Sequence, residues 1–211
     1  MPPTKDRYHH GDLRAELLRA SLQLIESEGL AAVSLRRVAR EAGVSPGAPY
    51  HHFADRAALF AALAAQGYDL LRAAMIAARA AAADPREALI AMAEAYVRFA
   101  REQPAHFRLM FRPELVQPEK NPATAEAGDA AFAELEDAIA VATRAGSLTA
   151  EGAETLALAW WSMAHGLASL TLDGKFDLRA EQMGTTSAAL TERITRMFAG
   201  LLDAPQSIER R

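Results

Sequence analysis

Apolar residues recur every three or four positions along most of the chain, which is the spacing of a helix with one buried face. The first such stripe comprises Leu13, Leu17, Leu18, Leu24 and Ile25. Asp12 is a good N-cap for this helix, and Gly29 is a good stop because glycine tolerates a positive φ. The segment therefore predicts a first helix between these two residues.

Two much shorter helices are predicted next. The first covers residues 35–42, with Ser34 as its N-cap and Gly43 as its stop. The second covers residues 46–53 and begins with a proline, whose missing N–H costs nothing at that position. Pro49 is the fourth residue of this second helix and removes one backbone hydrogen bond.

The rest of the chain predicts six further helices and no strand. Their starts are marked by Asp55, Asp84-Pro85, Pro104, Ala123, Ala150 and Thr186. Glu87 stands three residues after Asp84, the spacing of a capping box. Residues 113–122 contain three prolines and predict a loop. We therefore expect an all-α fold of about nine helices.

Composition agrees with a helical globular protein and narrows its chemistry. Hydrophobic residues make up 51% of the chain, and alanine, the best helix former, dominates them. The absence of cysteine excludes disulfides and thiolate chemistry. Residues 155–172 carry no formal charge, but their serine, histidine, glycine and threonine residues indicate a buried helix rather than a membrane span. No secretory segment is visible, so we expect a cytoplasmic location.

The net charge of −4 is unevenly distributed. The first sixty residues hold eight Lys and Arg against seven Asp and Glu, and the remaining residues hold fifteen against twenty. Binding to nucleic acid requires a local basic face rather than a basic protein. The asymmetry is a weak indication that any such face lies in the N-terminal region.

The sequence offers little for catalysis. His9-His10 and His51-His52 are adjacent pairs, which cannot both face one metal ion on a helix. There is no glycine-rich phosphate loop and no nucleophile elbow, and the serines near His165 have no acidic residue at a spacing that would orient this histidine. We therefore expect no metal site, no cofactor and no enzyme activity.

Residues 34–53 have the sequence form of a helix-turn-helix, and a longer pattern surrounds them. The chain reads Ala42-Gly43-Val44-Ser45, then Tyr50-His51-His52-Phe53, then Arg56. Residues 12–60 in this way resemble the DNA-binding domain of TetR-family regulators. The resemblance implies a helix-turn-helix domain at residues 1–55, with a mobile arm at residues 1–10. It also implies a ligand-sensing and dimerisation domain of helices at residues 56–211.

The resemblance implies which side chains contact operator DNA. The second short helix would enter the major groove as the recognition helix. The residues that would hold phosphates are Ser34, Ser45, Tyr50, His52 and Arg56. The residues that would face the groove are Arg36, Pro46, Gly47, Ala48 and His51. Arg36 and His51 carry the hydrogen-bonding groups best suited to reading bases.

Plainer interpretations of these residues stay open. Residues 50–53 could be a capping cluster of an ordinary helical bundle, and Arg36 could be a solvated surface charge. Lys5, Arg7 and Arg14 could reach flanking phosphates or the minor groove, although chain termini are commonly disordered.

Aromatic and methionine side chains of the later helices are candidates for a small-molecule site, since such sites are apolar cavities with a few polar tips. The candidates are Met75, Tyr96, Phe99, Phe107, Met110, Phe111, Trp161 and His165. The alternative for each is a filled core, and His165 could be a ligand contact or a core histidine. The run from Trp161 to Gly166 resembles the Trp…His-Gly motif of one TetR subgroup. A cavity is implied by the resemblance, and its side chains favour an apolar or amphipathic effector.

The resemblance also implies a homodimer, because relatives pack two helices from each subunit about a two-fold axis. The candidate interface residues are Leu156, Trp160, Leu167, Leu190, Ile194, Met197 and Leu201. The predicted function is a ligand-responsive repressor that binds a palindromic operator. Two alternatives stay open: a ligand-dependent activator of the same fold, and a small-molecule-binding helical protein with vestigial DNA binding.

Overall fold

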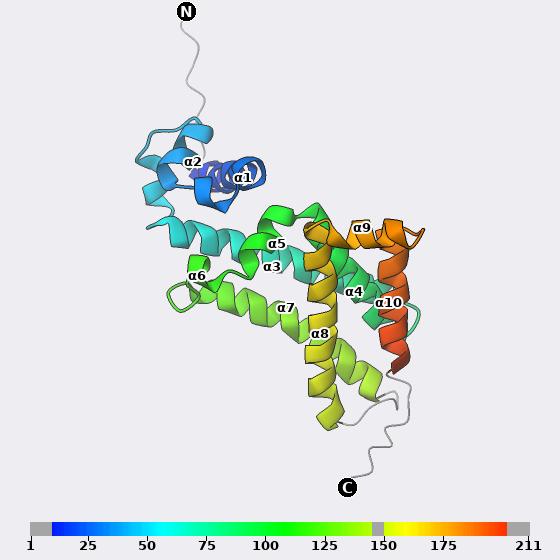
Figure 1. Ribbon diagram of the computed structural model, residues 1–211. Helices are drawn as coiled ribbons and strands as arrows, with labels where there is room; N and C mark the ends of the chain where they lie inside the picture. The colour runs from blue at the N-terminus through cyan, green and yellow to red at the C-terminus, as the bar shows by residue number, and fades with distance from the viewer. Residues whose placement is uncertain (1–9, 145–149, 202–211) are drawn as a thin grey trace, which may run out of the picture. The chain divides into compact units, whose positions relative to one another are not determined.

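A computed structural model describes residues 10–144 and 150–201. These residues form α-helices and two 3₁₀ turns, and no β-strand occurs among them (Figure 1). The helices are α1 (His10–Glu28), α2 (Leu35–Glu41), α3 (Arg56–Ala81), α4 (Pro85–Glu102), α5 (Pro104–Met110), α6 (Pro113–Val116), α7 (Pro122–Ala142), α8 (Ala150–Leu172), α9 (Lys175–Gln182) and α10 (Ser187–Leu201). The 3₁₀ turns are η1 (Leu30–Ala32) and η2 (Ala48–His51). The all-α fold expected from the sequence is confirmed.

Local capping chemistry fixes several helix starts where the sequence predicts them. Ser34 and Asp55 accept hydrogen bonds from backbone N–H groups in the first turns of α2 and α3. Asp84 Oδ1 accepts from two N–H groups in the first turn of α4, at 2.9 Å each. The predicted capping box is not completed by Glu87, because its carboxylate pairs with Arg196 of α10 at 2.9 Å.

The structure differs from the prediction at three other places. Helix α1 begins at His10, two residues before the predicted cap Asp12. Residues 113–122 are not a continuous loop, since Pro113 occupies the first position of the short helix α6. Helix α9 was not predicted, because its eight residues bury only Phe176 and Ala180, too few to show a helical period.

By packing, the chain divides into two compact units. The first comprises residues 1–67 and 105–126, and the second comprises residues 68–104 and 127–211. This division lies later in the chain than the predicted boundary after residue 55, because the start of α3 belongs to the first core. The functional boundary itself stays a prediction.

In the first unit, α1, α2 and the start of α3 supply the core. Its fully buried side chains include Leu17, Val38 and Phe60. Helices α3 and α5 cross closely at Gly67, where an added Cβ would lie 2.6 Å from the sulfur of Met110. The missing side chain at this position therefore makes room for α5.

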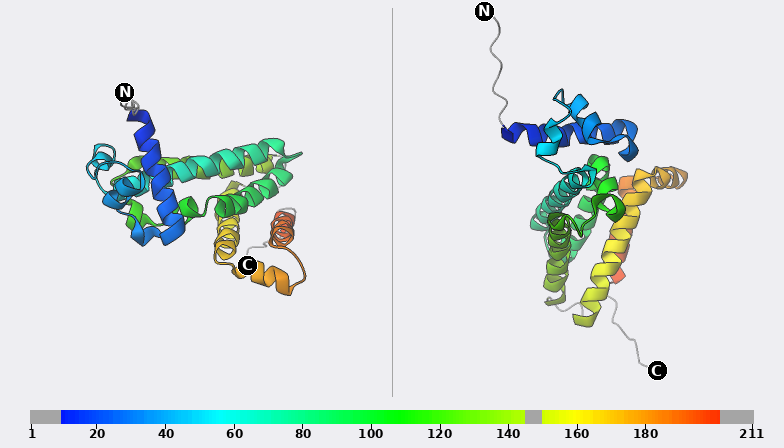
Figure 2. Two further views of the ribbon diagram at one scale, coloured as in Figure 1. Left: turned by 90° about the horizontal axis from the view of Figure 1, so that it is seen from above. Right: turned by 90° about the vertical axis from the view of Figure 1, so that its left-hand side faces the viewer.

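In the second unit, α4 is the central helix and packs against both α8 and α10. Trp160 of α8 is only 2% exposed, and its indole N–H donates to the Leu89 carbonyl of α4 at 3.0 Å. Helices α8 and α10 lie side by side, and α9 joins them (Figures 1 and 2). The uncharged stretch 155–172 lies in α8, with one face buried against α4 and the other exposed.

Replacing Gly43 by alanine is expected to destabilise the first unit by about 1 kcal/mol, because its φ of +68° disfavours a Cβ. Gly47 is a matched control, since its φ is −86°. At both positions an added Cβ would meet no heavy atom of the described residues within 4 Å, apart from those of the chain neighbours. Gly47→Ala should shift the free energy of unfolding, measured by chemical denaturation, by less than about 0.5 kcal/mol. Equal losses for the two variants would contradict this assignment.

Candidate DNA-binding interface

The turn between α2 and η2 is closed by backbone hydrogen bonds. The Val44 N–H donates to the Ala39 carbonyl at 2.9 Å, and the Gly43 N–H donates to the Arg40 carbonyl at 3.2 Å. Ala39 is fully buried, which allows the chain to fold back closely over α2. The sequence therefore forms the compact helix-turn-helix that its small residues predict.

The second short element of the helix-turn-helix is the 3₁₀ turn η2 at Ala48–His51, and not the longer helix predicted over residues 46–53. Pro49 has no N–H with which to reach the Ser45 carbonyl four residues earlier. The Ala48 N–H bonds this carbonyl instead, at 3.0 Å, which is a three-residue step. The Pro49 ring is buried, so packing as well as bonding fixes the turn.

Most of the side chains predicted to contact DNA lie on the surface of the first unit. The exposed ones are Ser34, Arg36, Ser45, Pro46, Gly47, Tyr50 and His51, while Ala48 and His52 are half-buried. Tyr50 is 52% exposed, so its ring and hydroxyl are accessible to a partner. Arg40, which the sequence analysis did not single out, is exposed one helical turn after Arg36. The four-residue spacing of these two arginines was the available signal.

Two of the predicted phosphate-binding arginines make contacts inside the protein. Arg56 Nη2 donates to the Leu30 carbonyl at 2.7 Å, and the guanidinium lies 4.7 Å from the centre of the Phe60 ring. Arg56 therefore links the start of α3 to η1 through this hydrogen bond. Its predicted contact with a DNA phosphate stays a prediction. The guanidinium of Arg14 lies 5.5 Å from the centre of the Phe53 ring. Lys5 and Arg7 lie outside the described residues.

The predicted ligand-binding residues divide between the two units. Phe107, Met110 and Phe111 belong to the first unit. Those in the second unit are Met75, Tyr96, Phe99, Trp161 and His165. All are buried or half-buried except Trp161, which is 37% exposed. Whether these residues line one site stays a prediction.

Three of these residues do come together in the second unit. Tyr96 Oη lies 3.0 Å from His165 Nδ1, and the ring centres of Trp161 and His165 are 6.1 Å apart. Burial raises the pKa of Tyr96 far above its usual value and lowers the pKa of His165. A neutral phenol and a neutral imidazole therefore share this hydrogen bond at neutral pH. This bond satisfies His165 as a core residue, and a ligand contact stays a prediction.

The predicted dimer residues are mostly interior residues of the protomer. Leu156, Trp160, Leu167 and Leu190 are buried within the second unit, so they do not offer a surface to a partner. Ile194 is half-buried and Met197 is 67% exposed, whereas the side chain of Leu201 lies outside the described residues. On α8 the exposed leucines are instead Leu158 and Leu170, at 56% and 44%. A hydrophobic stripe marks the buried face of a helix without distinguishing a core from an interface.

The described residues give no sign of a metal site and only weak evidence for a membrane-spanning helix. No three His, Asp or Glu side chains of the described residues gather as metal ligands. Helix α3 is long and apolar enough to cross a membrane by length and composition, and 44% of its most apolar window is buried. A core helix of a soluble protein passes the same test, so this one candidate is weak evidence for a membrane span.

A helix-turn-helix with exposed serine, arginine, tyrosine and histidine side chains, carried on a helical scaffold, defines the class of helical DNA-binding regulators. Residues 17–63 match the family model described as bacterial regulatory proteins, tetR family. Residues 89–204 match the model described as tetracyclin repressor-like, C-terminal domain. The chain belongs to the TetR family of transcriptional regulators, which are not enzymes. The finer resemblance to the Trp…His-Gly subgroup stays a prediction.

Known proteins agree with this assignment. A solved protein of unknown function from Rhodococcus sp. RHA1 is 33% identical, has a TM-score of 0.82, and aligns over 95% of this chain and 100% of its own. The TetR-family regulator PfmR from Thermus thermophilus is 23% identical with a TM-score of 0.66, over 92% and 99%, and shows the fold alone. The HTH-type transcriptional regulator BetI from Rhizobium meliloti (strain 1021) is 38% identical over 79 residues. That alignment spans 37% of this chain and only 39% of BetI.

Proposed function

We propose that the protein is a ligand-responsive repressor that binds a palindromic operator as a homodimer. The observation that carries the DNA-binding part is the exposure of Arg36, Tyr50 and His51 on the two short elements of the helix-turn-helix. Such a surface offers cationic, hydroxyl and imidazole groups within one compact unit. We call the exposed residues Ser34, Arg36, Arg40, Ser45, Tyr50 and His51 the DNA-binding face.

The DNA-binding face divides into positioning and reading groups. The first turn of α2 and the Tyr50 hydroxyl suit phosphate oxygens, because backbone N–H groups at a helix start and hydroxyls donate to anions. Arg36 and His51 are the candidates for base edges. Pro46 and Gly47 have no hydrogen-bonding side chains, so shape and apolar contacts must supply much of the sequence preference.

The ligand response is proposed to act through α3. This helix contributes residues 56–67 to the first unit and residues 68–81 to the second. An effector in the second unit can change operator affinity only by binding one arrangement of the protein more tightly than another. The apolar and aromatic side chains near Tyr96 favour an apolar or amphipathic effector.

Fluorescence anisotropy on duplex fragments from just upstream of the gene tests the DNA-binding part. Tyr50→Ala and His52→Ala are each expected to weaken operator binding about ten-fold or more, because each removes a contact with the phosphate backbone of the DNA. Wild-type affinity should fall steeply with salt through counterion release. Arg193→Ala is the matched control, because this exposed arginine lies on α10 and belongs to the second unit.

The possible outcomes separate the alternatives. Equal binding by wild type and both variants would exclude Tyr50 and His52 as contacts to the operator backbone. Binding that appears only after an effector is added would favour an activator. Failure to select any fragment from the whole genome, with or without effectors, would favour the vestigial interpretation.

A further inference from the structure

A cleft of about 380 Å³ lies between α4 and α10 in the second unit. One wall is the face of α4 that carries Glu94, Arg98 and Arg101, and Thr171 of α8 also lines the cleft. The opposite wall is formed by α10 residues Ser187, Ala188, Ala189, Thr191 and Glu192. Its volume is at the low end of the range for small-molecule sites. Tyr96 is buried on the other side of α4, so the cleft is separate from the Tyr96–His165 pair.

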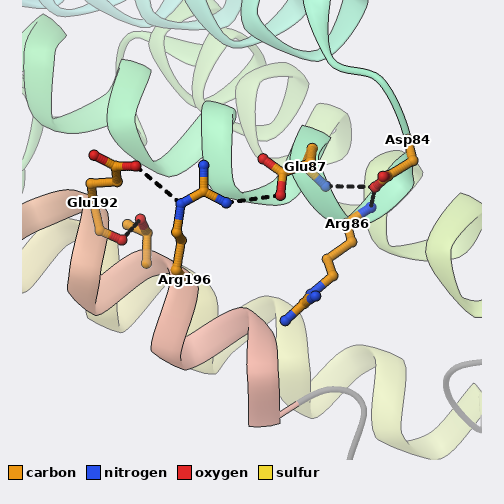
Figure 3. Close-up of polar contacts among 6 residues, drawn as sticks. Asp84, Arg86, Glu87, Glu192 and Arg196 are labelled. Carbon is orange, nitrogen blue, oxygen red and sulfur yellow. Dashed lines mark hydrogen bonds and ion pairs between the residues drawn. The ribbon is translucent and has the colours of Figure 1, made fainter.

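The two walls run antiparallel. Glu87, near the start of α4, pairs with Arg196, near the end of α10, and Arg196 also pairs with Glu192 at 3.1 Å (Figure 3). The end of α4 therefore faces the start of α10. Arg98 and Arg101 accordingly lie toward the end of the cleft where α10 begins.

The acidic end of the cleft contains two carboxylates. Glu94 and Glu192 both line the cleft. Burial raises the pKa of Glu94 and the charge of Glu192 raises it further, whereas the charges of Arg196 and Arg98 lower it. Arg196 already pairs with Glu192, whereas no ion pair of Glu94 occurs in the described part of the chain. A cationic group placed beside Glu94 would offset its burial.

The basic end of the cleft contains two arginines, Arg98 and Arg101, whose guanidinium groups can bind an anion. Both Arg98 and Arg101 are exposed, and neither pairs with a carboxylate among the described residues. Guanidinium groups bind carboxylates through paired N–H donors. Val97 of α4 and the small side chains Ala188 and Ala189 of α10 also line the cleft.

We propose that this cleft binds a small zwitterion, with its anionic group at Arg98 and Arg101, its cationic group at Glu94, and its apolar stem along Val97. Opposite charges at the two ends disfavour a simple anion or a simple cation, because each would meet one like charge. The site is independent of the DNA-binding face, and its occupation can be measured without DNA.

The test is isothermal titration of the full chain with 4-aminobutanoate, 6-aminohexanoate and 8-aminooctanoate, which differ only in the distance between their charges. Hexanoate and hexylamine are the probes with a single charge. At least one zwitterion should bind saturably, about ten-fold more tightly than either single-charge probe. If hexanoate binds as tightly as the zwitterions, the cleft is a site for anions and the proposal is wrong. The proposal is also wrong if none of the three zwitterions binds saturably.

Variants then locate the binding. Arg101→Gln and Glu94→Gln are each expected to weaken the best zwitterion about ten-fold or more. Arg193→Gln is the control, since it removes an exposed α10 arginine that does not line the cleft. Circular dichroism melting curves show that each variant is folded. Binding unchanged in both cleft variants would place the site elsewhere and refute the proposal.

Discussion

Replacing Trp160 by alanine is expected to lower the free energy of unfolding of the second unit by about 3–5 kcal/mol. The side chain is 2% exposed, and its ring meets that of Tyr96 edge-on, with centres 6.3 Å apart. The substitution removes this packing, leaves a cavity between α8 and α4, and deletes the hydrogen bond to the Leu89 carbonyl. Chemical denaturation followed by helix circular dichroism measures the loss.

The neighbouring Trp161 provides the control for this experiment. It is 37% exposed and contacts Phe132 with ring centres 6.0 Å apart. Trp161→Ala is expected to cost less than about 2 kcal/mol, because a partly exposed side chain leaves a smaller cavity. Similar losses for the two tryptophans would contradict the different roles that the structure gives them.

The second large effect is expected at the exposed face of α8, which we propose as the interface of the homodimer. Leu158→Arg combined with Leu170→Arg should convert the dimer to a monomer, because unpaired charges would be buried between subunits. Both leucines are exposed in the protomer. Between them on the same face of α8 lie Ser162, Gly166 and Ser169, whose small size leaves room for a partner helix.

Sedimentation velocity over a range of concentrations measures the oligomeric state. Ile76→Arg is the control, since Ile76 is 41% exposed on α3 and lies outside the proposed interface. The double variant should keep its helical circular dichroism, because neither leucine is part of the core. A wild-type protein that stays monomeric, or a double variant that stays dimeric, would refute this interface.

The sequence predicted the features that depend on neighbouring residues. The caps at Ser34, Asp55 and Asp84 and the turn at Gly43 were predictable because a side chain and the backbone next to it determine them. Helix α9 was missed because few of its residues are buried.

Features that depend on distant parts of the chain were not predictable in the same way. Arg56 lies against Leu30 and Phe60, and nothing in its local sequence indicates that carbonyl or that ring. Leu156 and Leu158 are both leucines of α8, yet the first is buried and the second is exposed, because α4 covers only one side of the helix. The α4–α10 cleft likewise required the packing of two helices far apart in sequence.

The buried ring of Pro49 has a consequence for how operator preference can evolve. In the proposed complex with DNA, a turn held by a buried proline would lose little conformational entropy on binding, because its shape is already fixed in the free protein. The flanking residues Pro46, Gly47 and His51 are exposed and contribute nothing to the core. Gene duplicates could therefore diverge in target sequence at these positions while the scaffold beneath them keeps its stability.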